Sequence, residues 1–382
     1  MFRRSIEVIV ERFSQIYPVI GITGPRQSGK TTLARVLFPH LPYVNLENLD
    51  IRIQAKSDPR AFLARYKQGA IFDEVQHVPE LLSYLQQIVD ESSQKGRYIV
   101  TGSQNFALSE QVAQTLSGRI GMLTLLPLSM NELDFDSNDF SSVIFQGGYP
   151  GLYQRNMNPT EFFPSYIQTY LERDVRQIKN IEDLGLFQTF IRLCAGRIGQ
   201  VLNYSSLAKD CGISHTTVYK WLTVLEASYI IFLLQPYHKN FSKRLVKNPK
   251  LYFYDTGLAS SLLGLEQERQ LETHYLKGNL YENLIILEVL KARLNRGLIP
   301  NLYFWRDLSG REVDLIAEWG GSTKAIEIKA GSTLQPNFVK NVNYFCSLDE
   351  QAKGYVLYSG QEGFYWDTTL LPVRYIQRLL DE

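Results

Sequence analysis

A glycine-bounded loop near the start of the chain carries the residues needed to hold a phosphate chain. The stretch YPVIGITGPRQSGKTTLARVLF predicts an apolar strand, a loop from Gly24 to Gly29 and a helix that begins at Lys30. It matches the pattern G-x-x-x-x-G-K-[ST] in full and in the strand–loop–helix context that the pattern requires. Loop amides and the helix N-terminus bind phosphate oxygens, Lys30 neutralises phosphate charge and Thr31 ligates magnesium. We therefore predict ATP and Mg²⁺ as cofactors, bound by Gly24, Pro25, Arg26, Gln27, Ser28, Gly29, Lys30, Thr31 and Thr32.

A second apolar strand, GAIFDEVQHV, ends in two carboxylates. Apolar residues that run into Asp73 and Glu74 are typical of a Walker B strand. Asp73 would hold the magnesium shell, and Glu74 would polarise the attacking water. Acidic pairs at strand ends are common, so this assignment depends on the phosphate-binding loop that precedes it.

A third pattern lies in the last third of the chain, in GREVDLIAEWGGSTKAIEIKA. Side chains alternate between the two faces of a strand, so Glu327 and Lys329 share one side. A hairpin at the Gly-Gly pair would bring Asp314 to the same side. Either a metal-dependent centre for phosphodiester hydrolysis or the ordinary charged face of a half-buried sheet fits this pattern.

The middle of the chain, LNYSSLAKDCGISHTTVYKWLTVLEAS, has the form of a helix-turn-helix, with Ser214 able to cap the second helix. Two strand-like segments follow, IIFLLQPY and PKLYFYD, which together predict a winged helix. The run between them lacks acidic residues and predicts contacts with the DNA backbone. Its basic residues are Lys239, Lys243, Arg244, Lys247 and Lys250. A protein-docking module with a solvated basic loop is the alternative, because the expected recognition helix carries Lys220 as its one positive formal charge.

Length, composition and cysteine usage limit the class of protein to which the chain can belong. A chain of 382 residues with 45% hydrophobic and 21% charged residues is long enough for two or three domains. Its three cysteines are scattered singly, which disfavours a zinc site or a disulfide framework and fits a reducing cytoplasm. The N-terminal MFRRSIEVIVERF predicts a helix rather than a signal peptide, and no apolar run approaches the roughly 20 residues that span a bilayer. We therefore expect a cytoplasmic protein with no membrane partner.

The order of these elements resembles the AAA+ superfamily. More narrowly, the chain resembles a prokaryotic group of AAA+ ATPases with a C-terminal domain of the restriction-endonuclease, PD-(D/E)XK, type. The segments that carry this resemblance are GPRQSGKTTL, IFDEVQ, YIVTGSQ, LSGRIGMLTLLPLSMNEL, GGYPGLY, YLERDV and YFYDTGLAS. The fold class expected is α/β: an AAA+ P-loop domain with a parallel sheet at 1–155, a helical and winged-helix domain at 156–262, and a PD-(D/E)XK nuclease-like α/β domain at 263–382.

The resemblance to AAA+ ATPases implies roles for three further polar residues. Ser103, followed by Gln104, lies where these ATPases carry sensor 1, although a simple turn is the alternative. Arg119 lies where they send an arginine finger into a neighbouring subunit, although pairing with a helix dipole would also explain it. Arg173 corresponds to a sensor 2 residue or caps a helix.

The resemblance to restriction endonucleases implies roles in the C-terminal third. Glu282, from a helix, would join Asp314 and Glu327 as ligands of a divalent metal, and Lys329 would stabilise the pentacovalent phosphate. These residues permit metal binding, but cleavage does not follow from them.

Together these patterns predict an ATP hydrolase that couples turnover to DNA binding and to remodelling or translocation, on duplex or branched DNA such as Holliday junctions. A homo-oligomer, a hexamer, is expected. Two alternatives stay open: an ATP-dependent switch that binds a protein partner, and an ATP-gated, metal-dependent DNA nuclease.

Overall fold

The computed structural model describes residues 2–92, 94–103, 115–135, 140–171, 183–238 and 246–381. Five residues singled out above lie outside these ranges: Gln104, Arg173, Lys239, Lys243 and Arg244. Within the described ranges, no helix is both long enough and apolar enough to cross a membrane.

Apolar strands in the first third of the chain form a five-stranded parallel sheet in the order β2-β3-β4-β1-β5. Alternate residues point to opposite faces, so Ile20 and Ile99 pack toward α1 and α2, while Val19 and Val100 pack toward α4 and α5. The predicted α/β fold with a parallel sheet is confirmed. The elements are α1 (Glu7–Ser14), β1 (Val19–Thr23), α2 (Lys30–Leu37), β2 (Tyr43–Asn45), α3 (Leu49–Ser57), α4 (Pro59–Ala64), β3 (Ala70–Asp73), η1 (Val75–His77), α5 (Leu81–Asp90), β4 (Tyr98–Gly102) and β5 (Ile120–Thr124).

Short helices follow, and two of them form the predicted helix-turn-helix. Asn203 caps α12, Gly212 ends it with a left-handed φ of 72°, and Ser214 caps α13 by accepting from the Thr217 amide at 3.0 Å. The elements of this part are α7 (Ser141–Gln146), α8 (Pro150–Gln154), α9 (Pro159–Tyr166), η2 (Ile167–Leu171), α11 (Leu184–Ala195), α12 (Tyr204–Cys211), α13 (His215–Ala227) and α14 (Thr256–Leu262).

The two strands expected to form a wing belong to a larger sheet. β6 (Ile231–Pro236) and β7 (Lys250–Phe253) pair in antiparallel fashion, but β6 also pairs in parallel with β8. They therefore form one edge of an eight-stranded sheet in the order β12-β13-β11-β10-β9-β8-β6-β7. This sheet joins strands from the two predicted segments, 156–262 and 263–382, in one layer.

The rest of this sheet contains the predicted hairpin. β9 (Glu312–Trp319) and β10 (Ser322–Lys329) are antiparallel neighbours joined at Gly320 and Gly321, which have φ values of 56° and 83°. Helix α15 covers one face of the sheet and α16 the other. The remaining elements are η3 (Glu268–Thr273), α15 (Lys277–Asn295), β8 (Leu302–Arg306), η4 (Pro336–Phe338), α16 (Lys340–Leu348), β11 (Ala352–Tyr358), β12 (Gly363–Tyr365), β13 (Thr368–Pro372), η5 (Val373–Tyr375) and α17 (Ile376–Asp381).

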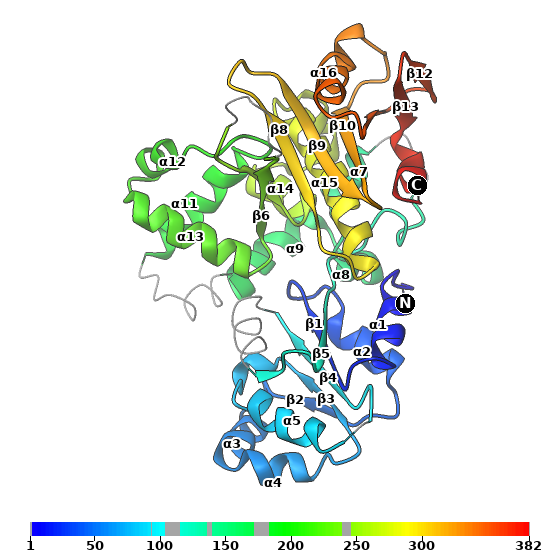
Figure 1. Cartoon of the computed structure of the whole chain (residues 1–382). Coiled ribbons are helices and arrows are strands. Elements are labelled where there is room, and N and C mark those ends of the chain that lie inside the picture. Colours follow the sequence, from blue (N-terminus) through cyan, green and yellow to red (C-terminus); the bar gives the residue numbers. More distant parts are fainter. Residues whose placement is uncertain are drawn as a thin grey trace.

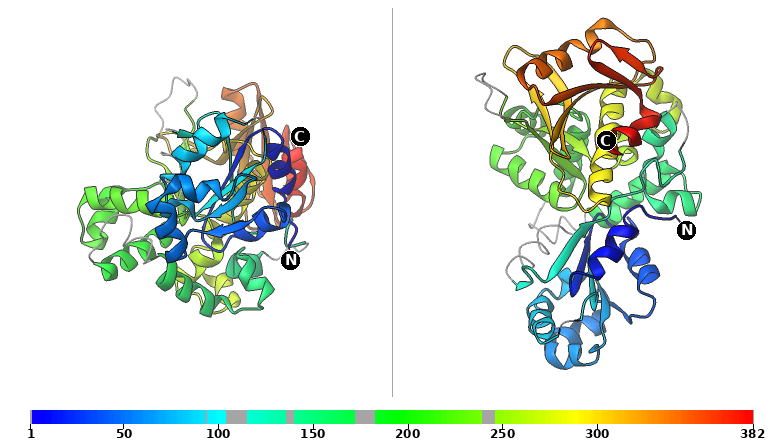
Figure 2. Two further views of the ribbon diagram at one scale, coloured as in Figure 1. Left: turned by 90° about the horizontal axis from the view of Figure 1, so that it is seen from below. Right: turned by 45° about the vertical axis from the view of Figure 1, so that its right-hand side comes forward.

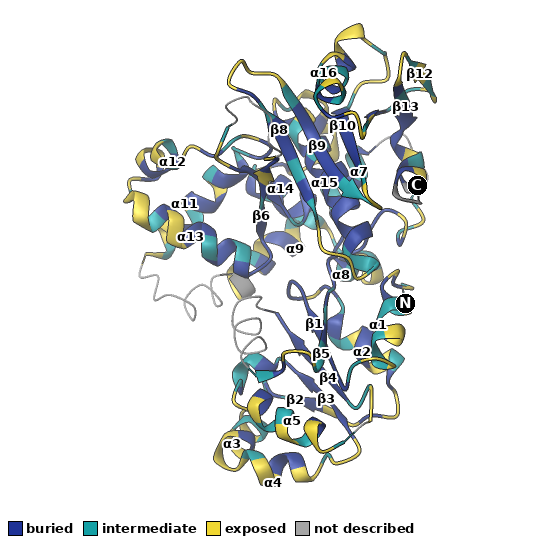
Figure 3. Cartoon of the chain, viewed as in Figure 1, coloured by how far each residue is buried: buried dark blue, intermediate teal, exposed yellow. Residues whose placement is uncertain are grey.

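The two sheets occupy opposite ends of the molecule, with the short helices beside and between them (Figures 1 and 2). Helix α8 lies at the junction, near α1 and the N-terminus (Figure 1). The strands of both sheets are mainly buried, whereas the outer faces of α3, α4, α12 and α13 are exposed (Figure 3). The junction therefore places residues of the second part of the chain above the end of the first sheet that carries the phosphate-binding loop.

Candidate ATP-binding site and carboxylate centre

The loop between β1 and α2 has a backbone that only particular residues tolerate. Gly24 and Gly29 have φ values of 144° and 99°, in the region that favours glycine. A Cβ on Gly24 would lie 2.1 Å from the Leu125 carbonyl oxygen, so a side chain there would collide with the backbone that follows β5. The loop is thus wound tightly at the carboxyl end of β1, as the sequence pattern predicted.

Lys30 is buried within this loop. Its Nζ donates to the carbonyl oxygens of Gly24, at 3.0 Å, and Pro25, at 2.8 Å, with the side chain only 4% exposed. The hydroxyl of Ser28 is also buried and has no hydrogen-bond partner. A buried cation and an unsatisfied hydroxyl inside a glycine-rich loop at a helix N-terminus fit a bound phosphate chain.

Asp73, at the end of β3, accepts hydrogen bonds from three hydroxyl groups. The Thr31 hydroxyl donates to it at 2.8 Å and the Tyr43 hydroxyl at 2.7 Å, and the Thr101 hydroxyl is a third donor. Burial, followed by the bond to Asp73, raises the pKa of Tyr43 above its usual range. The adjacent oxygens of Thr31 and Asp73 are the hard ligands that Mg²⁺ prefers, so these residues fit the predicted ion.

Glu74 points elsewhere because its backbone turns. It has a left-handed φ of 56°, and its carboxylate accepts from the Ser103 hydroxyl at 2.8 Å and from the Gln76 amide. Burial acts to raise the pKa of Glu74, but the charge of Lys30 and the Gln76 hydrogen bond outweigh it and lower the pKa. Glu74 is therefore an ionised acceptor beside Lys30, and a strained backbone aims it there.

A pocket of about 380 Å³ opens above the loop. Its floor includes Lys30, Thr31 and Glu74, and its opposite wall comes from α8 and the residues that follow it. Arg155 is the cationic side chain among the described lining residues of that wall. The sequence pattern GGYPGLY gave no role to its neighbour Arg155, because nothing in the sequence reveals that this segment folds over the phosphate-binding loop.

Arg4 is a second residue that sequence reasoning missed. Its guanidinium is 7% exposed and donates to the carbonyl oxygens of Ser28, at 2.8 Å, and Leu126, at 2.6 Å. It also pairs with Glu132 at 3.2 Å. Arg4 thus fastens the N-terminal segment to the phosphate-binding loop and to the segment after β5.

Arg119 lies far from this pocket in its own chain. It forms a bidentate ion pair with Asp90 at the end of α5: Nε donates to Oδ1 at 2.5 Å and Nη2 donates to Oδ2 at 3.0 Å. It precedes β5, whose Ile120 pairs with Val19 and whose Thr124 pairs with Thr23. The length of β1, about 17 Å at the usual rise per residue, separates it from the phosphate-binding loop. Its predicted role in a neighbouring subunit stays a prediction.

The hairpin brings three of the predicted C-terminal residues together. Lys329 Nζ lies 2.6 Å from a Glu327 oxygen and 3.7 Å from an Asp314 oxygen. The same Asp314 oxygen accepts from the Ile328 amide at 2.8 Å. Burial, then the charge of Asp314, raises the pKa of Glu327.

Glu282 approaches this centre from α15, but with partners of its own. Lys250 Nζ lies 3.0 Å from Glu282 and 2.6 Å from Glu312, and the Tyr252 hydroxyl donates to Glu282. Burial raises the pKa of Glu282 to about 7. Among the described residues, no group of three or more His, Cys, Asp or Glu side chains is arranged to hold a metal ion.

Lys250 corrects one prediction. It was expected on an exposed basic arm, but it is 2% exposed because it begins β7, which pairs within the large sheet, and it faces acidic side chains. It is not available to DNA in this structure. Lys247, three residues earlier, is exposed.

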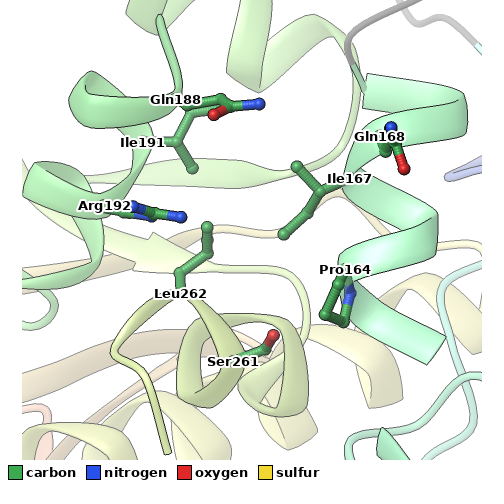
Figure 4. Close-up of a pocket in the computed structure, with 8 residues that line it drawn as sticks. All are labelled: Pro164, Ile167, Gln168, Gln188, Ile191, Arg192, Ser261 and Leu262. Carbon is green, nitrogen blue, oxygen red and sulfur yellow. The ribbon is translucent and has the colours of Figure 1, made fainter. Parts of the chain in front are cut away.

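A second pocket, of about 280 Å³, lies between α9, α11 and α14 (Figure 4). Arg192 and Gln188 line it from α11, opposite Ile167 and Pro164. It carries no carboxylate, histidine or cysteine among its described lining residues, and it shares none of them with the pocket above the phosphate-binding loop.

Residues 17–134, which contain this loop and the first sheet, match the family model described as "AAA domain". The match and the loop geometry support an AAA-type P-loop ATPase. Residues 137–269 match a model described as "Domain of unknown function (DUF8612)", and residues 277–376 match one described as "Domain of unknown function (DUF4143)".

Similar proteins extend over most of the chain. An uncharacterized protein of Mycobacterium tuberculosis is 28% identical over 375 residues, which is 97% of this chain and 83% of the relative. An uncharacterized protein of Methanocaldococcus jannaschii is 24% identical over 360 residues, 85% of this chain and 76% of the relative. Among solved structures, the Walker-type ATPase of Pyrococcus abyssi has 17% identity and a TM-score of 0.46, over 69% of this chain and 96% of that one.

Proposed function

We propose that this AAA-type ATPase couples ATP hydrolysis to the binding and remodelling of DNA, branched DNA included. The main support for ATP hydrolysis is that four residues converge at the carboxyl ends of parallel strands: Lys30, Thr31, Asp73 and Glu74. Binding of the phosphates would give Lys30 charged oxygens in place of the two loop carbonyls that it now contacts. Magnesium, held by Thr31 and Asp73, would neutralise phosphate charge.

The hydrolytic role in this proposal belongs to Glu74. An ionised carboxylate held by Ser103 and Gln76 can orient a water and accept its proton. Gln76 also donates to the Ser103 hydroxyl at 3.2 Å, so the three side chains hold each other in place. Arg155, on the opposite wall, would bring a cation to the phosphates from the same chain, whereas Arg119 would have to act on a neighbour.

The DNA-binding part of the proposal rests on exposed groups near the helix-turn-helix. On α13, Tyr219 is 62% exposed, and His215 and Lys220 are also exposed. Lys247 adds a charge at the end of the basic run. An exposed aromatic ring next to a lysine on one helix suits base stacking and backbone contact without sequence readout. Because Lys250 is buried, it no longer belongs to this set, and the expected number of phosphate contacts is lower.

We further propose that the active form is a homo-oligomer, with a hexameric ring as the arrangement to test. The support is the position of Arg119 at the edge of the sheet remote from its own ATP pocket. In a ring of head-to-tail contacts, one edge of each subunit meets a different surface of the next.

The test is the steady-state ATPase rate without DNA and with duplex, single-stranded or four-way-junction DNA. We expect DNA to raise the rate, the junction most strongly, and the effect to weaken as salt rises because phosphate contacts release counterions. Replacing Lys243, Arg244 and Lys247 together by glutamine should reduce the stimulation and leave the DNA-free rate unchanged. An ATPase rate that none of these DNAs changes from the DNA-free rate would refute the coupling and favour a nucleotide switch that binds a protein partner.

A further inference from the structure

The carboxylate centre already contains a cation that belongs to the chain. Lys250 enters it from β7, a strand at the edge of the eight-stranded sheet, and is 2% exposed. Its Nζ contacts Glu282 at 3.0 Å and Glu312 at 2.6 Å, which places it between α15 and β9. An ammonium group in this position has its donors directed at the oxygens that a metal would need.

From this geometry we infer that Lys250 takes the place of a divalent metal ion at this centre, so that Glu282 is a partner of lysine and not a metal ligand. The native centre is then a closed ion-pair cluster that joins β7, α15, β9 and β10. This inference is independent of the ATPase and of the proposed DNA binding.

The charges of the cluster agree with this assignment. Four carboxylates, of Glu282, Glu312, Asp314 and Glu327, meet two ammonium groups, and the Arg306 guanidinium contacts Glu312 at 3.1 Å. Each carboxylate therefore has a cation of the chain within 4.0 Å. A divalent ion would be repelled by the two ammonium groups that now pair with these carboxylates.

Some carboxylate oxygens of the centre already accept hydrogen bonds from the chain. The Glu282 oxygen Oε1 that accepts from Lys250 also accepts from the Tyr252 hydroxyl. The Asp314 oxygen Oδ2 accepts from the Ile328 amide. Glu327 Oε2 is a buried oxygen without a hydrogen-bond partner among the described residues, and this oxygen by itself falls short of the coordination that magnesium or calcium requires.

The experiment is a Mn²⁺ titration of the full chain without nucleotide, followed by the electron paramagnetic resonance signal of the free ion. The variants are wild type, Lys250→Met, and Lys250→Met with Glu282→Gln. Asp314→Asn measures manganese bound elsewhere, and Lys247→Met is a matched control at an exposed lysine three residues away. Melting temperatures with and without Mn²⁺ provide a second readout.

We expect wild type, Lys247→Met and Asp314→Asn to bind manganese equally weakly. Lys250→Met should tighten binding by about tenfold or more, because it removes a positive charge from among the carboxylates. Glu282→Gln in that background should reverse the gain. Binding by Lys250→Met within threefold of wild type would overturn the inference.

Loss of Lys250 removes the cation that pairs with the carboxylate of Glu282, and a variant that breaks such a pair can fail to fold. The single variant Glu282→Gln then serves as the test, because it keeps Lys250 paired with Glu312. If Glu282 is no metal ligand, this variant and wild type have the same Mn²⁺ isotherm. Manganese binding by wild type that weakens threefold or more in Glu282→Gln would overturn the inference by itself.

Discussion

Asp73 and Glu74 show how two adjacent carboxylates acquire different chemistry. Asp73 ends a buried strand and accepts three hydroxyl donors, from Thr31, Tyr43 and Thr101. Glu74, one residue later, has a left-handed backbone and faces Ser103 and Lys30 instead. The left-handed backbone of Glu74 therefore separates the Asp73 carboxylate, which suits magnesium, from the Glu74 carboxylate, which suits a water molecule.

Glu226 provides a test of how burial changes the pKa of a carboxyl group and the stability of the fold. It lies on α13, and burial raises its pKa from the ordinary 4.5 to about 7. Between these values the unfolded chain ionises Glu226 while the folded chain keeps it neutral, so stability is lost as pH rises from about 4.5 to 7. Glu226→Gln should therefore be more stable than wild type at pH 8, by on the order of 3 kcal/mol, with the advantage vanishing near pH 4.5.

Urea denaturation of both proteins at several pH values measures this difference. Glu80→Gln, at an exposed glutamate on the first domain, is the matched control and should show no such trend. A difference in free energy of unfolding between Glu226→Gln and wild type that stays constant from pH 4.5 to 8 would contradict the burial argument.

Individual site residues could be predicted from the sequence only where they lie close together along the chain. The phosphate-binding loop and the Asp73–Glu74 pair could be predicted because one local segment contains each. Tyr43, Arg4 and Arg155 could not, because tertiary packing brings each from a different part of the chain: Tyr43 to Asp73, Arg4 to the phosphate-binding loop and Arg155 to the pocket.

The direction of strands decides what Arg119 can reach. β5 and β1 are parallel and in register, so the residue before β5 lies at the amino edge of the sheet and the phosphate-binding loop at the carboxyl edge. Arg119 is about one-third exposed and paired with Asp90. If it acts in catalysis, it must act on another subunit.

Mixing two inactive variants tests this. Arg119→Ala keeps an intact phosphate-binding loop, and Lys30→Ala keeps an intact Arg119, so about one quarter of the interfaces in a randomly mixed ring would combine both intact parts. We expect ATPase activity to return in the mixture, while Arg65→Ala, at an exposed arginine of the same domain, stays active alone. If exchanged subunits remain inactive, Arg119 has no role in trans.

Secondary structure was predictable element by element, but the pairing of elements was less so. The Gly-Gly hairpin of β9 and β10 is local, and its sequence predicted it. β6 was expected in a wing, yet it also pairs with β8, about 70 residues later, and this pairing drew Lys250 into the carboxylate centre. An alternation pattern specifies which face of a strand is apolar, not which strand lies beside it.

Across the whole molecule, α15 connects the ATP pocket with the large sheet. Near its C-terminal end, Lys291 donates to the carbonyl oxygen of Leu128 at 2.7 Å, and Glu288 accepts from the Met130 amide at 2.9 Å. Leu128 lines the ATP pocket. Near its N-terminal end the same helix carries Glu282, bonded to Lys250.

A second link runs from the helix-turn-helix to the first sheet. The Tyr229 hydroxyl, just after α13, donates at 2.8 Å to the hydroxyl of Thr23, which ends β1 and immediately precedes the phosphate-binding loop. Tyr229 holds an unusual left-handed φ of 55°, a strain that surrounding contacts must offset. The residue that follows the helix-turn-helix is thus hydrogen-bonded to the strand that leads into the phosphate-binding loop.

All of these links matter for function only if the pocket hydrolyses ATP with Glu74. The direct measurement is the rate of phosphate release at saturating ATP by wild type, Glu74→Gln and the exposed control Glu80→Gln, together with nucleotide affinity. We predict that Glu74→Gln binds ATP with wild-type affinity and releases phosphate about 10²–10⁴-fold more slowly, whereas Glu80→Gln matches wild type. Phosphate release by Glu74→Gln at the wild-type rate would contradict the assignment of Glu74 and the hydrolytic site built around it.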